Sequence, residues 1–196
     1  MRLIQSLFRT GVVLCLAGLV GLQAVAGPSF NTDRQALDKL SASAGTELQR
    51  GFQNFHEMLM FLEQKDVTHA TEAKAAALQH FNESVALFKR VSEKASEQKI
   101  AYQPKDDSEK EIVGAFQNRL KELGIPEPAT EKQLASLAVT AVTKHIHVLE
   151  RSSFKGTQAD YPTLRKVLRS EAQLLDLGIL TSMVWTLSAA PPGGAG

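Results

Sequence analysis

Cysteine is almost absent from this sequence. The single cysteine, Cys15, lies within residues 1–26, a segment that we expect to be removed from the mature protein. The remaining 170 of the 196 residues then contain no thiol, which excludes disulfides, cysteine-ligated zinc, covalently attached c-type haem and a cysteine nucleophile. A chain of this length can bury a sizeable core without such cross-links.

An excess of charge of either sign is also absent. The full chain carries a formal net charge of +1, and loss of Arg2 and Arg9 leaves 20 basic against 21 acidic residues, a net charge of −1. Proteins that bind nucleic acid or anionic membranes usually carry a clear basic excess. The composition therefore argues against nucleic acid as a partner.

Catalytic motifs are missing as well. The sequence has no nucleophile elbow, no phosphate-binding glycine loop and no calcium-binding loop. His56-Glu57 begins a zinc-protease motif, but Met60 stands where the second histidine is required, and a thioether is a poor zinc ligand. No Glu-x-x-His pair of the di-iron type is present either. These absences favour a protein that is not an enzyme.

The first 26 residues have the features of a secretory signal peptide. Arg2 and Arg9 precede an apolar run over 11–22, and Ala24-Val25-Ala26 is a small-x-small cleavage site. An uncleaved membrane anchor is the alternative, but the run is shorter than the roughly 20 residues that a spanning helix needs. We therefore expect cleavage before Gly27 and export, to a bacterial periplasm or, alternatively, to the cell exterior, with no membrane span in the mature chain.

The rest of the chain has helical periodicity throughout, with apolar residues three and four apart. Hydroxyl or carboxylate residues mark the expected starts, and Gly124 and Pro191 mark stops. The starts are the capping boxes Thr32/Gln35, Ser108/Glu111 and Thr130/Gln133, and Asp160 before Tyr161-Pro162. The predicted helices cover 32–65, 68–99, 108–123, 130–153 and 161–189.

These helices predict an all-α fold, an antiparallel four-helix-type bundle with one extra short helix. Residues 27–190 form a single domain, in which a hairpin of the first two helices packs on the last two. The short helix over 108–123 fills the crossover. The Pro/Gly/Ala tail over 191–196 is expected to be disordered.

Histidines and methionines cluster over 54–70. His56 and Met60 are four residues apart and share a helix face, so they could offer two soft ligands to a metal that has further ligands elsewhere. Met58 falls on the opposite flank of that helix. The stretch 58–62 is apolar all round, so either another element of the fold or a partner must cover it.

His145 is the histidine with the strongest case for a role. On the helical wheel it falls within the core stripe of its helix, whereas His147 falls on the polar side. It is therefore expected to be buried, as a neutral ring hydrogen-bonded to a side chain or a carbonyl. The alternatives are a ligand of haem b or copper, together with Met58 or Met183, and a ligand-gated or pH-gated role.

The last predicted helix changes character near its middle. From Leu177 onward a second apolar stripe appears, so that this half is apolar all round. It is either central in the bundle or an interface with a protein partner or a second copy, with Trp185 as an anchor. The candidate interface residues are Leu177, Leu180, Val184, Trp185 and Leu187.

Together these features predict an exported, non-enzymatic helical bundle that binds or scaffolds a protein partner or a small ligand, without a cofactor. The alternative function is a haem- or copper-binding bundle that uses His145 with a methionine.

Overall fold

The computed structural model describes residues 28–97, 99 and 104–188, with side chains described between 35 and 184. The predicted signal peptide and C-terminal tail, and the side chains of Trp185 and Leu187, lie outside the described residues.

Within these limits the chain is all-α, as predicted. The helices are α2 (Pro28–Glu63), α3 (Val67–Lys94), α4 (Asp107–Leu123), α5 (Glu131–Glu150) and α6 (Tyr161–Ser188), and a 3₁₀ turn, η1 (Gln158–Asp160), precedes α6. The bounds agree with the predicted ranges to within a few residues. The largest difference is at the end of α3, which stops at Lys94 instead of continuing to 99.

The caps show where local prediction succeeds and where it fails. Thr130 and Gln133 form the predicted capping box of α5. The box predicted at Ser108 is wrong, because Asp106 caps α4 by accepting the Glu109 backbone N–H at 2.9 Å. A carboxylate at this position also interacts favourably with the helix dipole.

Of the two other predicted starts, the one at Thr32 is wrong, whereas the one after Asp160 is confirmed, because α6 begins at Tyr161. Thr32 lies inside α2, which already includes Pro28. Asp160 is buried at the end of η1, and its Oδ2 accepts the backbone N–H groups of Lys155 and Thr157 at 2.8 and 3.2 Å. It therefore holds the loop before α6 and does not cap α6. The predicted stop at Gly124 is confirmed, with the left-handed φ of 63° that favours glycine.

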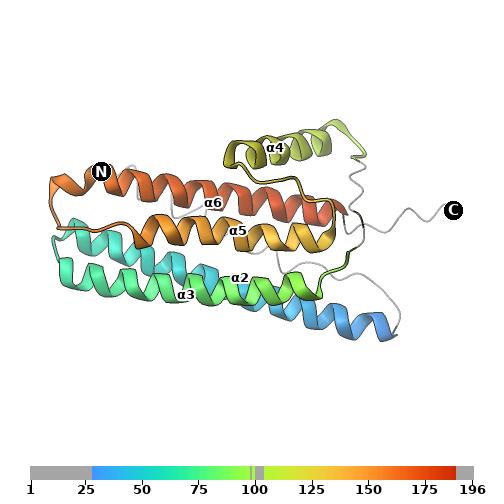
Figure 1. Ribbon diagram of the computed structural model, residues 1–196, viewed down its shortest axis with the longest axis horizontal. Helices are drawn as coiled ribbons and strands as arrows, with labels where there is room; N and C mark the ends of the chain where they lie inside the picture. Colours follow the sequence, from blue (N-terminus) through green and yellow to red (C-terminus); the bar gives the residue numbers. More distant parts are fainter. Residues whose placement is uncertain (1–27, 98, 100–103, 189–196) are drawn as a thin grey trace.

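The four long helices lie side by side with alternating chain direction (Figure 1). Close packing follows the order α2–α3–α5–α6, and α4 packs on the outside of α6. The chain leaves α3 and enters α5 at one place, because the Lys132 N–H donates to Ser96 O at 2.7 Å and Lys99 pairs with Thr130 in an isolated bridge. The connection from α3 to α5, which contains α4, therefore begins and ends at the same place in the bundle.

Aromatic rings fill the space between α2, α3 and α5. Phe52 and Phe81 meet edge to face with ring centroids 5.3 Å apart, and both are buried. The two helices approach closely at Gly51, where an added Cβ would lie 2.5 Å from the Phe81 ring. Glycine at this position therefore sets the distance between α2 and α3.

The second stripe of α6 is covered by the chain itself. Leu177 and Val184 are 1% and 0% exposed and belong to the same apolar cluster as Phe116 and Leu120, the buried residues of α4. Leu180 is half-buried against this cluster. Leu177 and Val184 are therefore already buried within the chain, which leaves neither side chain at the surface where an interface would need it.

The apolar tip of α2 is divided between interior and surface. Met58 is completely buried, whereas Met60 is 53% exposed. The Phe61 ring lies 5.3 Å from the His69 ring of α3, centroid to centroid. Elements of the fold thus cover most of this tip.

None of the helices in the described part of the chain has both the length and the apolar character that crossing a membrane requires.

Candidate functional site

His145 lies among aromatic rings in the interior. It is 1% exposed, and its ring centroid lies 5.1 Å from that of Phe81, 5.9 Å from that of Phe55 and 6.3 Å from that of Phe52. His147 is exposed and lies 3.3 Å from Glu150. The helical wheel of α5 therefore predicted both positions correctly.

The two ring nitrogens of His145 have different surroundings. Nδ1 lies 3.1 Å from Ser170 Oγ on α6, whereas Nε2 is buried without a hydrogen-bond partner among the described residues. Burial lowers the pKa of His145 to about 4, because a charged ring is poorly solvated among aromatic side chains. The imidazole is therefore neutral at neutral pH.

A second polar contact, which is partly buried, lies beside it. His56 Nε2 on α2 lies 3.1 Å from Glu171 Oε1 on α6, and the Glu171 side chain is 2% exposed. Because Ser170 and Glu171 are consecutive, α6 reaches two histidines from adjacent positions. We call His56, His145, Ser170 and Glu171 the polar layer. It joins α6 to α2 and to α5, and it fixes the relative position of these helices.

The structure separates most of the predicted metal-ligand pairs. His56 turns inward to Glu171, whereas Met60 of the same pair is exposed. Met183 lies thirteen residues after Ser170, about 20 Å farther along α6, and is 44% exposed. Only Met58, buried one turn after Phe55, lies on the part of α2 that contacts the His145 ring.

An apolar cavity of about 90 Å³ lies among α2, α3, α5 and α6. Small residues of α5 and α6, including Ala138, Ala141 and Gly178, leave this space, and larger apolar side chains close it. An added Cβ at Gly178 would meet nothing within 4 Å. The larger lining residues are Leu48, Phe52, Phe88, Leu137, Val142, Leu174, Leu175, Leu177 and Ile179, with Thr181 and Ser182.

The cavity lies beside the seam between α2 and α6. α2 and α6 pack less closely against each other than α2 does against α3 or α6 against α5. Leu48 of α2 and Ile179 of α6, both half-buried, line the cavity. The polar layer bridges the same seam nearer the start of α6. The seam is therefore held at one place by a hydrogen bond and is less tightly packed beside the cavity.

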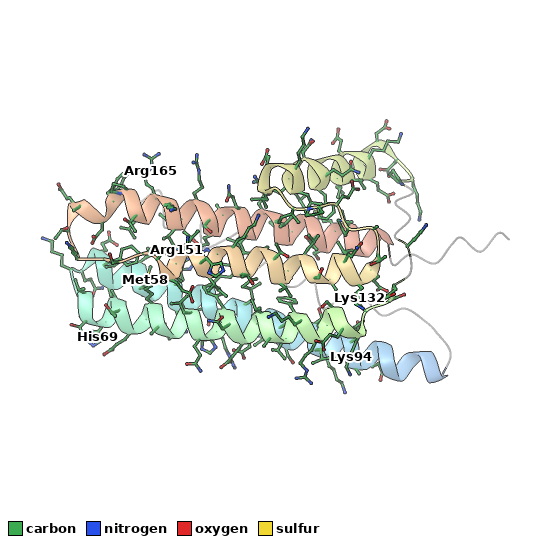
Figure 2. All side chains as sticks on the ribbon, viewed as in Figure 1. Met58, His69, Lys94, Lys132, Arg151 and Arg165 are labelled. Carbon is green, nitrogen blue, oxygen red and sulfur yellow. The ribbon has the colours of Figure 1, made fainter. Side chains whose placement is uncertain are left out.

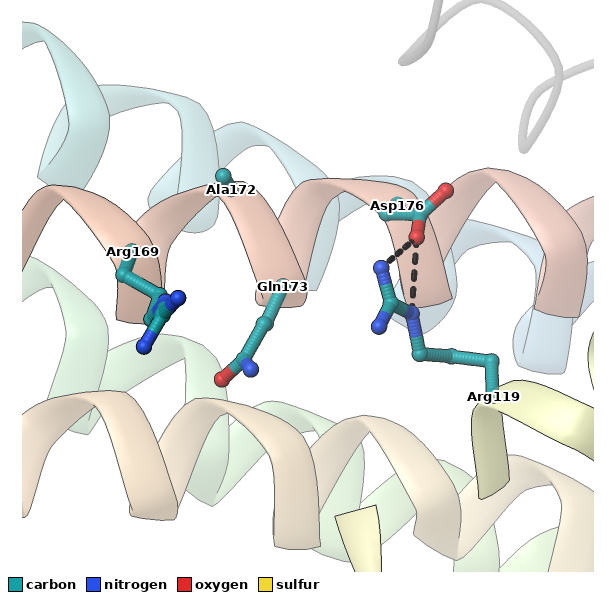
Figure 3. A pocket seen from close by; sticks show the side chains of 5 residues that line it. All are labelled: Arg119, Arg169, Ala172, Gln173 and Asp176. Atoms are coloured by element: carbon teal, nitrogen blue, oxygen red, sulfur yellow. Dashed lines mark hydrogen bonds and ion pairs between the residues drawn. The ribbon is translucent and has the colours of Figure 1, made fainter. Parts of the chain in front are cut away.

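A larger, polar cleft of about 540 Å³ lies on the opposite face of α6, where α4 approaches it. Figure 3 shows its five lining residues. Arg119 of α4 donates to Asp176 Oδ2 from Nε at 2.7 Å and also from Nη2, and it contacts Glu122 through Nη1. Asp176 holds the pKa of Arg119 above its ordinary value. Arg169, Ala172 and Gln173 form the rest of the lining.

A third polar group lies between α2 and α3. His80 Nδ1 is 2.7 Å from Glu47 Oε2 and 3.9 Å from Glu83 Oε2, so one ligand atom from each residue could reach a common ion. Glu47 also pairs with Arg50 at 2.6 Å, and its pKa is lowered mainly by the hydrogen bond from His80. Internal pairing therefore accounts for the geometry of this group.

Sequence reasoning missed Glu171 and the cavity. Glu171 is four residues after Val167 and three before Leu174, both buried, so its place on the core stripe of α6 was available from the wheel. The cavity depends on the distance between helices, for which the small residues of α5 and α6 were only an indirect signal.

Comparisons of the chain with protein-family models, with curated proteins and with solved structures find no match, so its function has to be inferred from the geometry of its own residues.

Proposed function

We propose that this chain is an exported, non-enzymatic binding protein, an antiparallel four-helix bundle with an extra helix that takes a small apolar ligand in the cavity among α2, α3, α5 and α6. The observation that supports the proposal is the lining of this cavity, which is almost entirely aliphatic and aromatic. Binding sites for small molecules are typically concave and apolar, and they commonly lie between the helices of bundles.

The size of the cavity limits the part of the ligand that it can hold. An apolar cavity of about 150 Å³ stays dry and accepts benzene. The cavity here, at about 90 Å³, has room for only a few carbon atoms. The proposed ligand is therefore an alkyl chain, with its end in the cavity and the remainder along the loosely packed seam between α2 and α6.

A series of 1-alkanols of increasing length, titrated into the mature protein by calorimetry, tests this proposal. Each methylene that enters contributes about 0.8 kcal/mol, or roughly fourfold in affinity. Affinity should rise with chain length until the cavity is full and more slowly after that. No saturable binding by any member of the series would contradict the proposal.

A matched pair of variants locates the site. Gly178→Leu places a side chain at the cavity wall, whereas Gly114→Leu makes the same change in α4, away from the cavity; an added Cβ meets nothing within 4 Å at either position. Gly178→Leu should weaken binding of the alkanols, and Gly114→Leu should not. Equal affinities in both variants would place the ligand elsewhere.

The unpartnered Nε2 of His145 favours a second candidate, a haem- or copper-binding bundle. Met58 is the methionine whose position on α2 suits this role, because Met183 is far along α6. Visible absorption and metal content, measured after expression with haem and copper supplied, distinguish the two candidates. A Soret band or stoichiometric copper that is lost in His145→Ala would favour the second.

A further inference from the structure

The cleft between α4 and α6 has an uncompensated positive charge at one end. Arg169 lines this end and makes no ion pair or hydrogen bond among the described residues, and Gln173 follows one turn later (Figure 3). At the other end, the Arg119 guanidinium pairs with two carboxylates, those of Asp176 and Glu122. Arg169 and Asp176 are seven residues apart, about 10 Å along the helix, so Asp176 does not neutralise Arg169.

The surroundings of Arg169 add further positive charge. In the turn of α6 before Arg169, over 165–168, the chain has two basic residues and no acidic one, and the carboxylate of Glu171 is buried against His56. The Asp160 carboxylate is buried and accepts two backbone N–H groups, so it offers no counterion at the surface. Arg165 and Lys166 are exposed one turn before Arg169, and Arg165 projects from the outer side of α6 (Figure 2).

We propose that this cleft binds the carboxylate or phosphate group of a small molecule, with Arg169 as its principal ligand. The planar guanidinium presents paired donors that match the oxygens of either group. The Gln173 amide is placed to add a donor from the next turn. The cleft has a volume of about 540 Å³ and is open to solvent, so an anion can reach Arg169 from bulk water. This site lies on the face of α6 opposite the apolar cavity and does not depend on the proposed alkyl ligand.

The test uses the mature protein at low ionic strength, with inorganic phosphate and succinate titrated separately. The Nε–H signal of the Arg169 side chain is followed by nitrogen-resolved NMR. Saturable displacement of this signal by one anion or by both, at millimolar concentration, supports the proposal and identifies the group that is bound. Absence of saturation for both anions would overturn it.

Three variants make the assignment specific. Arg169→Gln should weaken binding at least about tenfold, and Arg169→Lys should weaken it less, because charge remains but the forked donors are lost. Arg165→Gln removes a positive charge one turn away, outside the cleft, and should change affinity less than about threefold. Anion binding to the two Gln variants is measured by calorimetry. Equal losses in Arg165→Gln and Arg169→Gln would indicate a general surface potential and overturn the assignment. These residues are exposed, so thermal melts of the variants should match that of the parent.

Discussion

At the scale of single residues, His145 is a polar side chain in a largely apolar interior. It has one partner, Ser170, and one buried nitrogen with no partner among the described residues. Such an arrangement stabilises the fold through packing and one hydrogen bond, and it makes protonation of the ring unfavourable.

Replacing His145 should therefore be costly, and replacing His147 should not. His145→Ala removes a ring packed against three phenylalanines and leaves a cavity, so we expect a loss of about 1–3 kcal/mol in the free energy of unfolding. His147→Ala changes an exposed side chain and should be nearly silent. Chemical denaturation of both variants measures the difference, and equal losses would contradict the roles that we assign.

The depressed pKa of His145 also predicts a dependence of stability on pH. The ring titrates near 6.5 in the unfolded chain and at about 4 in the fold, so between these values the unfolded state binds more protons. Stability should therefore fall as the pH is lowered from about 6.5 to about 4, by up to about 3 kcal/mol, and this contribution should level off below that.

His145→Gln isolates this contribution, because the other titrating groups are unchanged. The difference in unfolding free energy between the parent and the variant should change across this pH window. A difference that stays constant with pH would show that His145 does not carry the effect.

At the scale of elements, α6 shows why an apolar surface on a helix is not sufficient evidence of a partner. Its second stripe was compatible with a central position and with an interface. The sequence could not distinguish them, because burial of this stripe depends on tertiary contacts. In the structure Leu177 and Val184 are buried within the chain, and α4 packs on α6.

Two adjacent residues of α6 test whether the chain itself buries this stripe. Val184→Glu would bury an unpaired carboxylate, so the protein should unfold or melt at a much lower temperature. Met183→Glu makes the same change at a side chain that is 44% exposed and should have little effect. Thermal melts with light scattering measure both. A Val184→Glu protein of unchanged stability but lower mass would restore the interface hypothesis for this residue.

Helix capping gives a second prediction at this scale. Thr130→Ala removes the capping box of α5 and should cost about 1 kcal/mol. Ser108→Ala should be nearly neutral, because Asp106 caps α4. Denaturant melts of the two single variants test this, and the opposite order would mean that Ser108 caps α4 in solution.

At the scale of the whole molecule, the position at which the signal peptide is cleaved is the remaining prediction from the sequence. The small-x-small site ending at Ala26 should place the mature N-terminus at Gly27. N-terminal sequencing of exported material measures this directly. A sequence that starts at Met1 would show that residues 1–26 are retained.

The sequence was sufficient for the parts of the structure that depend on local periodicity. The spacing of apolar residues within each helix predicted the five helices. The same spacing within α5 predicted that His145 is buried and His147 exposed. The contact between His56 and Glu171, the cavity beside Gly178 and the cleft at Arg169 depend on distances between helices. Periodicity carries no information about those distances, so these sites required the structure.

The backbone contact between Ser96 and Lys132 has a consequence for chain connectivity. The end of α3 lies beside the start of α5, so the segment between them is a loop whose two ends meet. The entropic cost of closing such a loop changes only slowly with its length. A short turn could therefore replace this segment and leave α2, α3, α5 and α6 in the same order. The shortened chain would lack α4 and would expose the part of α6 on which α4 packs. Its main defect would be an apolar face prone to self-association, with the path of the remaining helices preserved.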